Sequence, residues 1–110
     1  MRYSVSLVVL LLAACVEAGG DALIRVGLHS STHLRAALFL GLGGLALISY
    51  GSLVNAPPWD FGRVIGVYVA CFFLVAQLIS WFGFGQKPAP MVLLGGALIL
   101  AGGCVVSLAK

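Results

Sequence analysis

Uncharged residues occupy most of this chain in long, unbroken runs. Aspartate, glutamate, lysine and arginine are absent from residues 36–59, 64–86 and 88–109. Each run holds the roughly 20 residues that a helix needs to cross ~30 Å of hydrocarbon. The pattern therefore predicts three membrane-spanning helices after residue 35.

Residues 3–28 form a further stretch that is apolar over its first half and polar over its second. We predict a fourth span here, whose second half is unusually polar because it contains Glu17, Asp21 and Arg25. The run that ends at Cys15 also resembles a lipoprotein-type cleavage site. A span is favoured, since cleavage would discard the half of the helix that leads to Glu17.

Four helices account for nearly the whole chain. We predict them at about residues 4–28, 34–56, 62–85 and 90–109. The loops between them are short, and prolines, which break helices, mark the second and third loops. Short loops place consecutive helices side by side and antiparallel. The expected fold is an all-α membrane protein in which residues 1–110 form one four-helix transmembrane domain.

Composition excludes an ordinary soluble domain. Hydrophobic residues make up 62% of the 110 residues and charged residues only 8%, with a mean hydropathy of +1.16, whereas soluble domains carry about 25% charged residues. We therefore expect a multi-pass protein of the cell inner (plasma) membrane. The three cysteines lie within apolar spans and lack C-x-x-C spacing, so we expect small core residues rather than disulfides or metal ligands.

The basic residues near the span ends, which orient a membrane protein, are evenly divided between the two sides. Those on the side of the termini are Arg2, Arg63 and Lys110, and those on the other side are Arg25, Arg35 and Lys87. A chain without charge bias can insert in both directions, which is the condition for an antiparallel, dual-topology homodimer. The alternative is one orientation, set by translation order or by a partner.

Glu17 lies near the middle of the first predicted span, where a charge costs at least ~2.5 kcal/mol. Four-residue steps place Glu17, Asp21 and Arg25 on one helix face, so this polar stripe should face the bundle or a wet cavity. Burial disfavours the charged form of a carboxyl group, and an acid in such a setting can exchange a proton for a cation. The alternative is an internal network in which Asp21 pairs with Arg25 and protonated Glu17 makes a hydrogen bond between helices.

Other polar and aromatic residues of the spans have two interpretations each. Amphipathic or polar groups inside the spans can line a pocket for an organic cation, the aromatic ones through their π faces; they are Tyr50, Tyr68, Trp81 and Gln77. Buried core aromatics are the commoner explanation. Asp60 fits a helix N-cap, and Arg63 fits a side chain that reaches the membrane interface.

Sequence motifs for catalysis are missing. His29 and His33 have no cysteine or carboxylate at metal-binding spacing. The sequence contains no nucleophile-base-acid set and no phosphate-binding loop, and its six basic residues are too scattered to form a nucleic-acid footprint. We therefore expect neither an enzyme nor a protein that holds a metal or cofactor.

Glycine occurs 15 times, and its spacing is regular in the later spans. Small residues follow one another four apart at Gly62, Gly66 and Ala70, and glycine pairs repeat seven residues apart in the fourth span. Such stripes let helix backbones approach closely in lipid. Packing within one bundle is the plainer interpretation, and the stripe of the fourth span could equally be a dimer contact.

Two segments resemble the small multidrug resistance transporters of the drug/metabolite transporter superfamily. Residues 17–25, Glu-Ala-Gly-Gly-Asp-Ala-Leu-Ile-Arg, are similar to that family's first-helix motif, which has a glutamate, a glycine three residues on, a leucine, and a basic residue eight residues on. Residues 80–87, Ser-Trp-Phe-Gly-Phe-Gly-Gln-Lys, and the glycines that follow resemble the end of its third helix and its fourth helix.

This resemblance implies a homodimeric, dual-topology exchanger in which Glu17 binds protons and a cationic substrate alternately. The chain departs from the family at Tyr68, where the transporters usually have a substrate-contacting tryptophan, and at Asp21, which replaces a hydroxyl residue. The loop at residues 56–63 is longer and more charged than expected for these transporters. Together with the Gly-Arg-Val and Gly-Val-Tyr-Val stretches, it is instead similar to a YnfA-like four-helix sister group.

The leading hypothesis is a secondary transporter that exports a small cationic or amphipathic compound in exchange for protons. The residues expected to carry it are Glu17 as the proton and substrate site, Tyr68, Tyr50 and Trp81 as pocket walls, and Asp21 and Arg25 as a supporting layer or gate. Expected partners are a second copy of the chain, membrane lipid, protons and the cation, but not nucleic acid. The alternatives are a non-transporting assembly subunit and a component of a lipid or lipid-linked sugar translocase.

Overall fold

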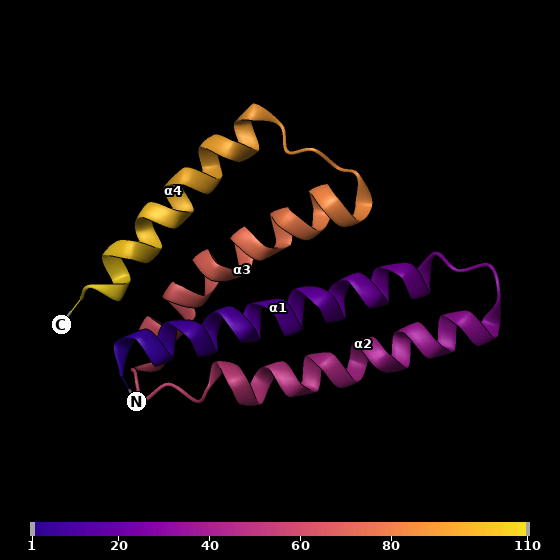
Figure 1. The fold of residues 1–110 in the computed structure, drawn as a ribbon, viewed down its shortest axis with the longest axis horizontal. Coiled ribbons are helices and arrows are strands. Elements are labelled where there is room, and N and C mark those ends of the chain that lie inside the picture. Colours follow the sequence, from indigo (N-terminus) through magenta and orange to yellow (C-terminus); the bar gives the residue numbers. More distant parts are fainter. Residues whose placement is uncertain (1, 110) are drawn as a thin grey trace.

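The computed structural model describes residues 2–109, and four long helices make up nearly all of it (Figure 1). They are α1 (Tyr3–Leu28), α2 (His33–Val54), α3 (Phe61–Phe84) and α4 (Pro90–Ser107). All four are long and apolar enough to cross a membrane, which confirms the predicted all-α membrane fold. The observed and predicted helix ends differ by at most two residues, at the C-terminal ends of α2 and α4.

Local sequence explains where the helices begin and end. The Thr32 hydroxyl accepts a hydrogen bond from the Arg35 backbone amide at 3.4 Å and so caps α2. Helix α3 ends at Gly85, whose φ of +66° is the left-handed conformation that favours glycine, and Pro90 occupies the first turn of α4. Asp60 stands at the predicted N-cap of α3, but its side chain makes no capping hydrogen bond.

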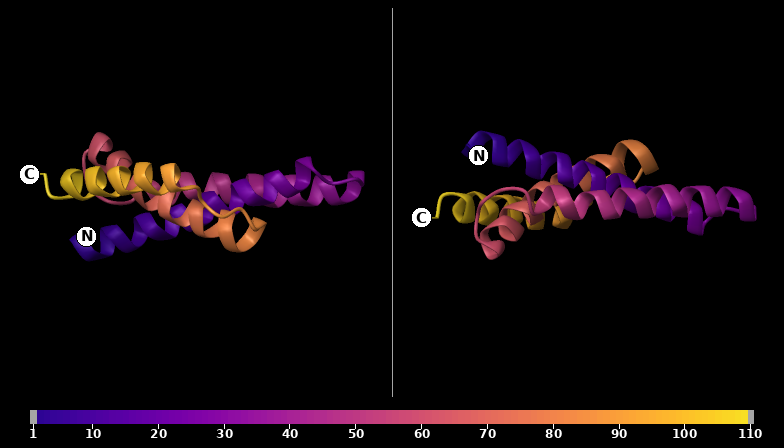
Figure 2. Two further views of the ribbon diagram at one scale, coloured as in Figure 1. Left: turned by 90° about the horizontal axis from the view of Figure 1, so that it is seen from above. Right: turned by 90° about the horizontal axis from the view of Figure 1, so that it is seen from below.

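The helices form an open arrangement rather than a closed bundle. Helices α1 and α2 lie side by side as an antiparallel hairpin, α3 packs on α1, and α4 packs on α3 (Figure 1). Seen from above and below, they make a thin layer (Figure 2), and the molecule measures 51 × 34 × 18 Å. Large parts of the apolar surface, above all on α2 and α4, therefore lack a neighbour within the protomer.

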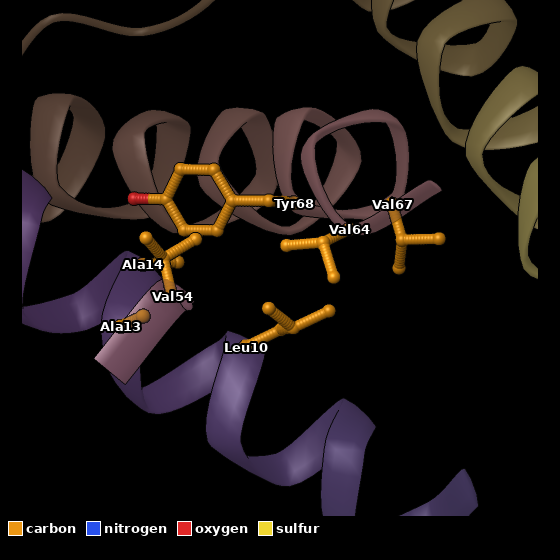
Figure 3. Packing of buried hydrophobic residues seen from close by; sticks show 7 residues of the cluster. All are labelled: Leu10, Ala13, Ala14, Val54, Val64, Val67 and Tyr68. Atoms are coloured by element: carbon orange, nitrogen blue, oxygen red, sulfur yellow. The ribbon is translucent and has the colours of Figure 1, made fainter. Parts of the chain in front are cut away.

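A small core forms where α1 crosses α3 near the end of α2. Its buried members are Leu10, Ala13 and Ala14 of α1, Val54 of α2, and Val64, Val67 and Tyr68 of α3 (Figure 3). In the close-up, Leu10 points toward Val64 and Val67. This contact holds the α1–α2 hairpin to α3 and sets which face of α1 meets Tyr68.

Glycines mark the closest helix contacts. A Cβ atom on Gly43 would lie 2.8 Å from the carbonyl oxygen of Gly20, so α1 and α2 cross there with backbone against backbone. A Cβ atom on Gly103 would collide with the Ala70 side chain, where α4 meets α3. Gly66 and Gly96, at the contact between α3 and α4, also face close neighbours, Val106 and Phe73. A Cβ atom would meet no atom within 4 Å at the following glycines: Gly41, Gly44, Gly62, Gly95 and Gly102. Only part of each stripe is used for packing within the protomer.

The cysteine expectation is wrong for two of the three residues. Cys15 and Cys104 are exposed on the outside of the helices, and Cys71 is half-buried. A thiol behaves as a small apolar group, which suits lipid as well as a core. Membership of an apolar span therefore does not tell which way a cysteine faces.

Polar and aromatic side chains hold the helices together at the end of the molecule where the termini lie. The Tyr3 hydroxyl donates a hydrogen bond to Ser107 Oγ at 2.9 Å, and Arg63 Nη2 donates one to the Ser107 carbonyl at 2.6 Å. The Arg63 guanidinium also lies 4.5 Å from the centre of the Trp59 ring. Arg63 thus binds the C-terminal end of α4, where a cation is favourable. Lys110, counted above among the basic residues of this end, lies outside the described residues.

Candidate functional site

Glu17 is half-buried on α1 and faces α3. The Tyr68 hydroxyl donates a hydrogen bond to Glu17 Oε1 at 2.9 Å. Tyr68 is only 4% exposed, and its ring centre lies 5.3 Å from that of Tyr50 on α2 and 6.0 Å from that of Phe72 on α3. An acid in the middle of α1 is therefore held by an aromatic cluster that α2 and α3 supply.

A cavity of about 340 Å³ adjoins this cluster, between the second half of α1 and the second half of α3. Asp21 and Arg25 line it from α1. Phe72, Gln77 and Ser80 line it from α3. Its volume is that of a pocket for a small ligand. Since Phe72 belongs to both the cavity wall and the aromatic cluster, the Glu17 site and the cavity are neighbours.

The predicted polar stripe is divided between the cavity and the aromatic cluster. Asp21 and Arg25 line the cavity, whereas Glu17 turns to Tyr68 and is not part of the lining. The physical reason is that each four-residue step of a helix advances by 40° beyond a full turn. Two steps rotate Arg25 away from Glu17 by about 80°, enough to place them against different parts of α3.

The alternative network of Asp21 with Arg25 is absent from the described part of the chain, residues 2–109. No ion pair forms between these two side chains, and the Arg25 guanidinium carbon lies 5.4 Å from the centre of the Phe84 ring. The other half of that alternative, a hydrogen bond from Glu17 to another helix, is present through Tyr68.

Trp81 lies apart from the other predicted site residues. It is 42% exposed and stacks on Phe82, with ring centres 5.1 Å apart, and it is not part of the cavity lining. Gln77, Ser80 and Phe84, spaced by three and four residues, define the face of α3 that meets the cavity. Trp81 follows Ser80 directly, so its side chain is rotated by about 100° from that of Ser80.

Several cavity residues were not predicted as site residues, among them Phe72, Ser80 and Phe84. A signal for them exists in the sequence, because Gln77 and Ser80 are the polar residues of an otherwise apolar stretch and stand three apart. The described residues contain no group of three side chains suited to hold a metal ion.

Comparison with known proteins identifies the family. A UPF0060 membrane protein of Saccharopolyspora erythraea is 32% identical over 102 residues, which cover 92% of this chain and 90% of that protein. The chain belongs to the UPF0060 membrane protein family. UPF0060 membrane proteins of Clostridium beijerinckii and Halalkalibacterium halodurans are 30% and 32% identical, over 92% and 84% of this chain and 90% and 83% of their own lengths. No family model and no solved structure matches the chain.

Membership of the UPF0060 family confirms the predicted similarity to the YnfA-like four-helix membrane proteins. The relatives match over most of their own lengths. With four helices apolar enough to cross a bilayer, this UPF0060 chain is a multi-pass membrane protein.

Proposed function

We propose that this UPF0060 protein is a secondary transporter of the small multidrug resistance type, within the drug/metabolite transporter superfamily. It exports a small cationic or amphipathic compound across the plasma membrane in exchange for protons. The observation that carries the proposal is the mid-span carboxyl group of Glu17, which accepts a hydrogen bond from Tyr68 beside a cavity of about 340 Å³. An ionisable group at this depth usually marks an ion or substrate path.

Glu17 serves protons and substrate in turn. Only its deprotonated form carries the negative charge that attracts a cation, so the proton must leave before the cation binds, and a returning proton displaces the cation. The Tyr68 hydroxyl stabilises the carboxylate through a charge-assisted hydrogen bond. The π faces of Tyr50 and Tyr68 favour an organic cation beside the carboxylate, while Asp21 and Arg25 form the adjoining cavity wall and gate.

The functional unit in this proposal is an antiparallel homodimer in which each protomer contributes one Glu17. The tie in basic residues allows both orientations to insert. The outer face of α4 offers a contact surface, because Leu98 and Val105 are 69% and 70% exposed and Gly102 meets no atom within 4 Å. Trp81, which is 42% exposed in one protomer, is assigned in this proposal to the pocket wall through contact with the partner.

Transport in proteoliposomes with a pH gradient tests this function. Glu17→Gln should abolish proton-driven movement of a quaternary ammonium compound, because the amide neither binds a proton nor attracts a cation. Asp60→Asn is the matched control, since its exposed carboxyl group at the start of α3 makes no capping hydrogen bond, and this variant should transport like the unchanged protein. Proton-driven transport retained in Glu17→Gln would refute the proposed role.

A non-transporting assembly subunit is the second candidate, and one observation favours it. The hydrogen bond from Tyr68 satisfies Glu17 within the protomer, as a purely structural contact between α1 and α3 would. Copurification with a larger membrane protein in one fixed orientation would favour this function. An antiparallel dimer with both Glu17 carboxyl groups toward one cavity would favour transport.

A further inference from the structure

A second cavity, of about 430 Å³, lies at the loop between α1 and α2, beyond the cavity that adjoins Glu17. Three basic or titratable side chains line it, namely Arg25, His29 and Arg35. Ser31 adds a hydroxyl group, and Phe84 of α3 closes one side. The lining within residues 2–109 contains no carboxyl group, so the positive charge of this cavity has no counter-charge within its walls.

Aromatic rings hold both guanidinium groups in place. The guanidinium carbon of Arg25 lies 5.4 Å from the centre of the Phe84 ring, and that of Arg35 lies 5.3 Å from the centre of the Phe39 ring. A guanidinium group over an aromatic face keeps the N–H donors on its edge free for an anion. These contacts fix two cationic donors at one cavity without consuming their hydrogen bonds.

The position of Arg35 adds to the excess of positive charge. It stands in the first turn of α2, where the helix dipole already makes a cation unfavourable, and that turn contains no acidic residue. A sequence would gain stability from an acid at this position. A basic residue here is explained if an anion occupies the cavity.

The location of the cavity indicates the kind of anion. Helix α1 ends at Leu28 and α2 begins at His33, so the cavity lies where the spans meet water. Lipid phosphates are concentrated at this depth, and basic pockets between transmembrane helices bind such head groups. Arginine forks match phosphate oxygens well.

We propose that this cavity is a phosphate-binding site, in which Arg25 and Arg35 bind the phosphate group of an anionic lipid or of a soluble phosphate compound. This cavity shares Arg25 and Phe84 with the cavity that adjoins Glu17. It does not include Glu17, and the phosphate proposal does not depend on the transport proposal. Ser31 supplies a further donor, whereas the Ser30 hydroxyl already donates to the Val26 carbonyl at 2.8 Å.

The amount of lipid that purified variants retain tests whether the bound phosphate group belongs to a lipid. Arg35→Gln removes one charge from the cavity, and Lys87→Gln, its control, removes one charge from the loop between α3 and α4 at the same membrane face, outside the cavity. From nanodiscs of mixed phosphatidylglycerol and phosphatidylcholine, Arg35→Gln should retain about tenfold less phosphatidylglycerol than Lys87→Gln, as lost charge-assisted hydrogen bonds predict. Circular dichroism checks that both variants are folded.

Adding inorganic phosphate to the protein in nanodiscs of phosphatidylcholine alone tests whether the cavity binds a soluble phosphate compound. If phosphate raises the thermal midpoint of the unchanged protein and of Lys87→Gln but not of Arg35→Gln, the cavity binds soluble phosphate. Loss of phosphatidylglycerol confined to Arg35→Gln identifies the lipid instead. If the two variants behave alike in both experiments, the positive charge acts only diffusely and the proposal is overturned.

Discussion

Helices α1 and α4 are both apolar enough to cross a membrane, yet they take part in the molecule in different ways. Helix α1 contains Glu17, Asp21 and Arg25 and packs against α2 and α3, whereas α4 contains no charged residue and packs along α3. The difference teaches that hydropathy identifies a membrane span but not a site. A site is indicated by a polar group inside a span that neighbouring side chains hold in place.

Exposure follows the same division. Leu10, Ala13 and Ala14 on α1 are fully buried, while Leu98 and Val105 on α4 are 69% and 70% exposed. Substitutions at the packed face of the α1–α2 hairpin should therefore change folding or ligand binding. Substitutions on the outer face of α4 should change only the association of protomers.

Gly43→Val should have the largest effect on stability, because its side chain would be forced against the Gly20 carbonyl and Ile24 of α1. We expect the free energy of unfolding to fall by about 1–3 kcal/mol relative to Gly44→Val. Gly44 is the matched control, since it lies next in the same helix and meets no atom within 4 Å. Unfolding in mixed micelles, followed by circular dichroism, measures both. Equal losses would show that α1 and α2 do not cross closely at Gly43.

Tyr68→Phe should weaken cation binding about tenfold at neutral pH, which corresponds to one hydrogen bond to a charged group. The variant keeps the ring in the aromatic cluster but removes the donor that stabilises the Glu17 carboxylate. Tyr3→Phe is the control, because it deletes a hydroxyl that donates to Ser107 over the same 2.9 Å, at the end where the termini lie. Calorimetric titration with a quaternary ammonium ion measures the difference, and equal affinities in the two variants would contradict it.

Gly102→Leu should have the smallest effect, about a fivefold weaker homodimer, from the loss of close packing between protomers in lipid. The protomer itself should fold normally, because Gly102 faces open space. Gly41→Leu introduces the same side chain at an open glycine of α2 and should leave the dimer unchanged. Energy transfer between labelled protomers in liposomes measures the dimer fraction. A loss that is equal in both variants would exclude the outer face of α4 as the contact.

Most of the secondary structure could be predicted from the sequence, because long runs without charge indicate membrane spans and the prolines between them break helices. The packing partners of α4 could not. Its apolar residues lie on all sides, so hydropathy does not distinguish a face toward α3 from a face toward lipid. The collision that a Cβ on Gly103 would have with Ala70 is what identifies the packed face.

The candidate site was predictable in part. Spacing placed Asp21 and Arg25 on one face of α1, and both line the cavity. The separation of Glu17 from that lining, and the outward position of Trp81, depend on how α1 and α3 are rotated about their own axes. That rotation is set by contacts between helices, such as Leu10 with the valines of α3 (Figure 3). It cannot be predicted from the periodicity of a single helix.

Proton release on cation binding tests the central claim, exchange at one carboxyl group, most directly. The purified protein, in weakly buffered detergent solution with a pH indicator, is titrated with guanidinium or a quaternary ammonium ion. The unchanged protein and Asp60→Asn should release protons as the cation binds, and Glu17→Gln should release none. Folded protein that binds the cation without releasing protons, or release that persists in Glu17→Gln, would contradict the exchange of proton and substrate at Glu17.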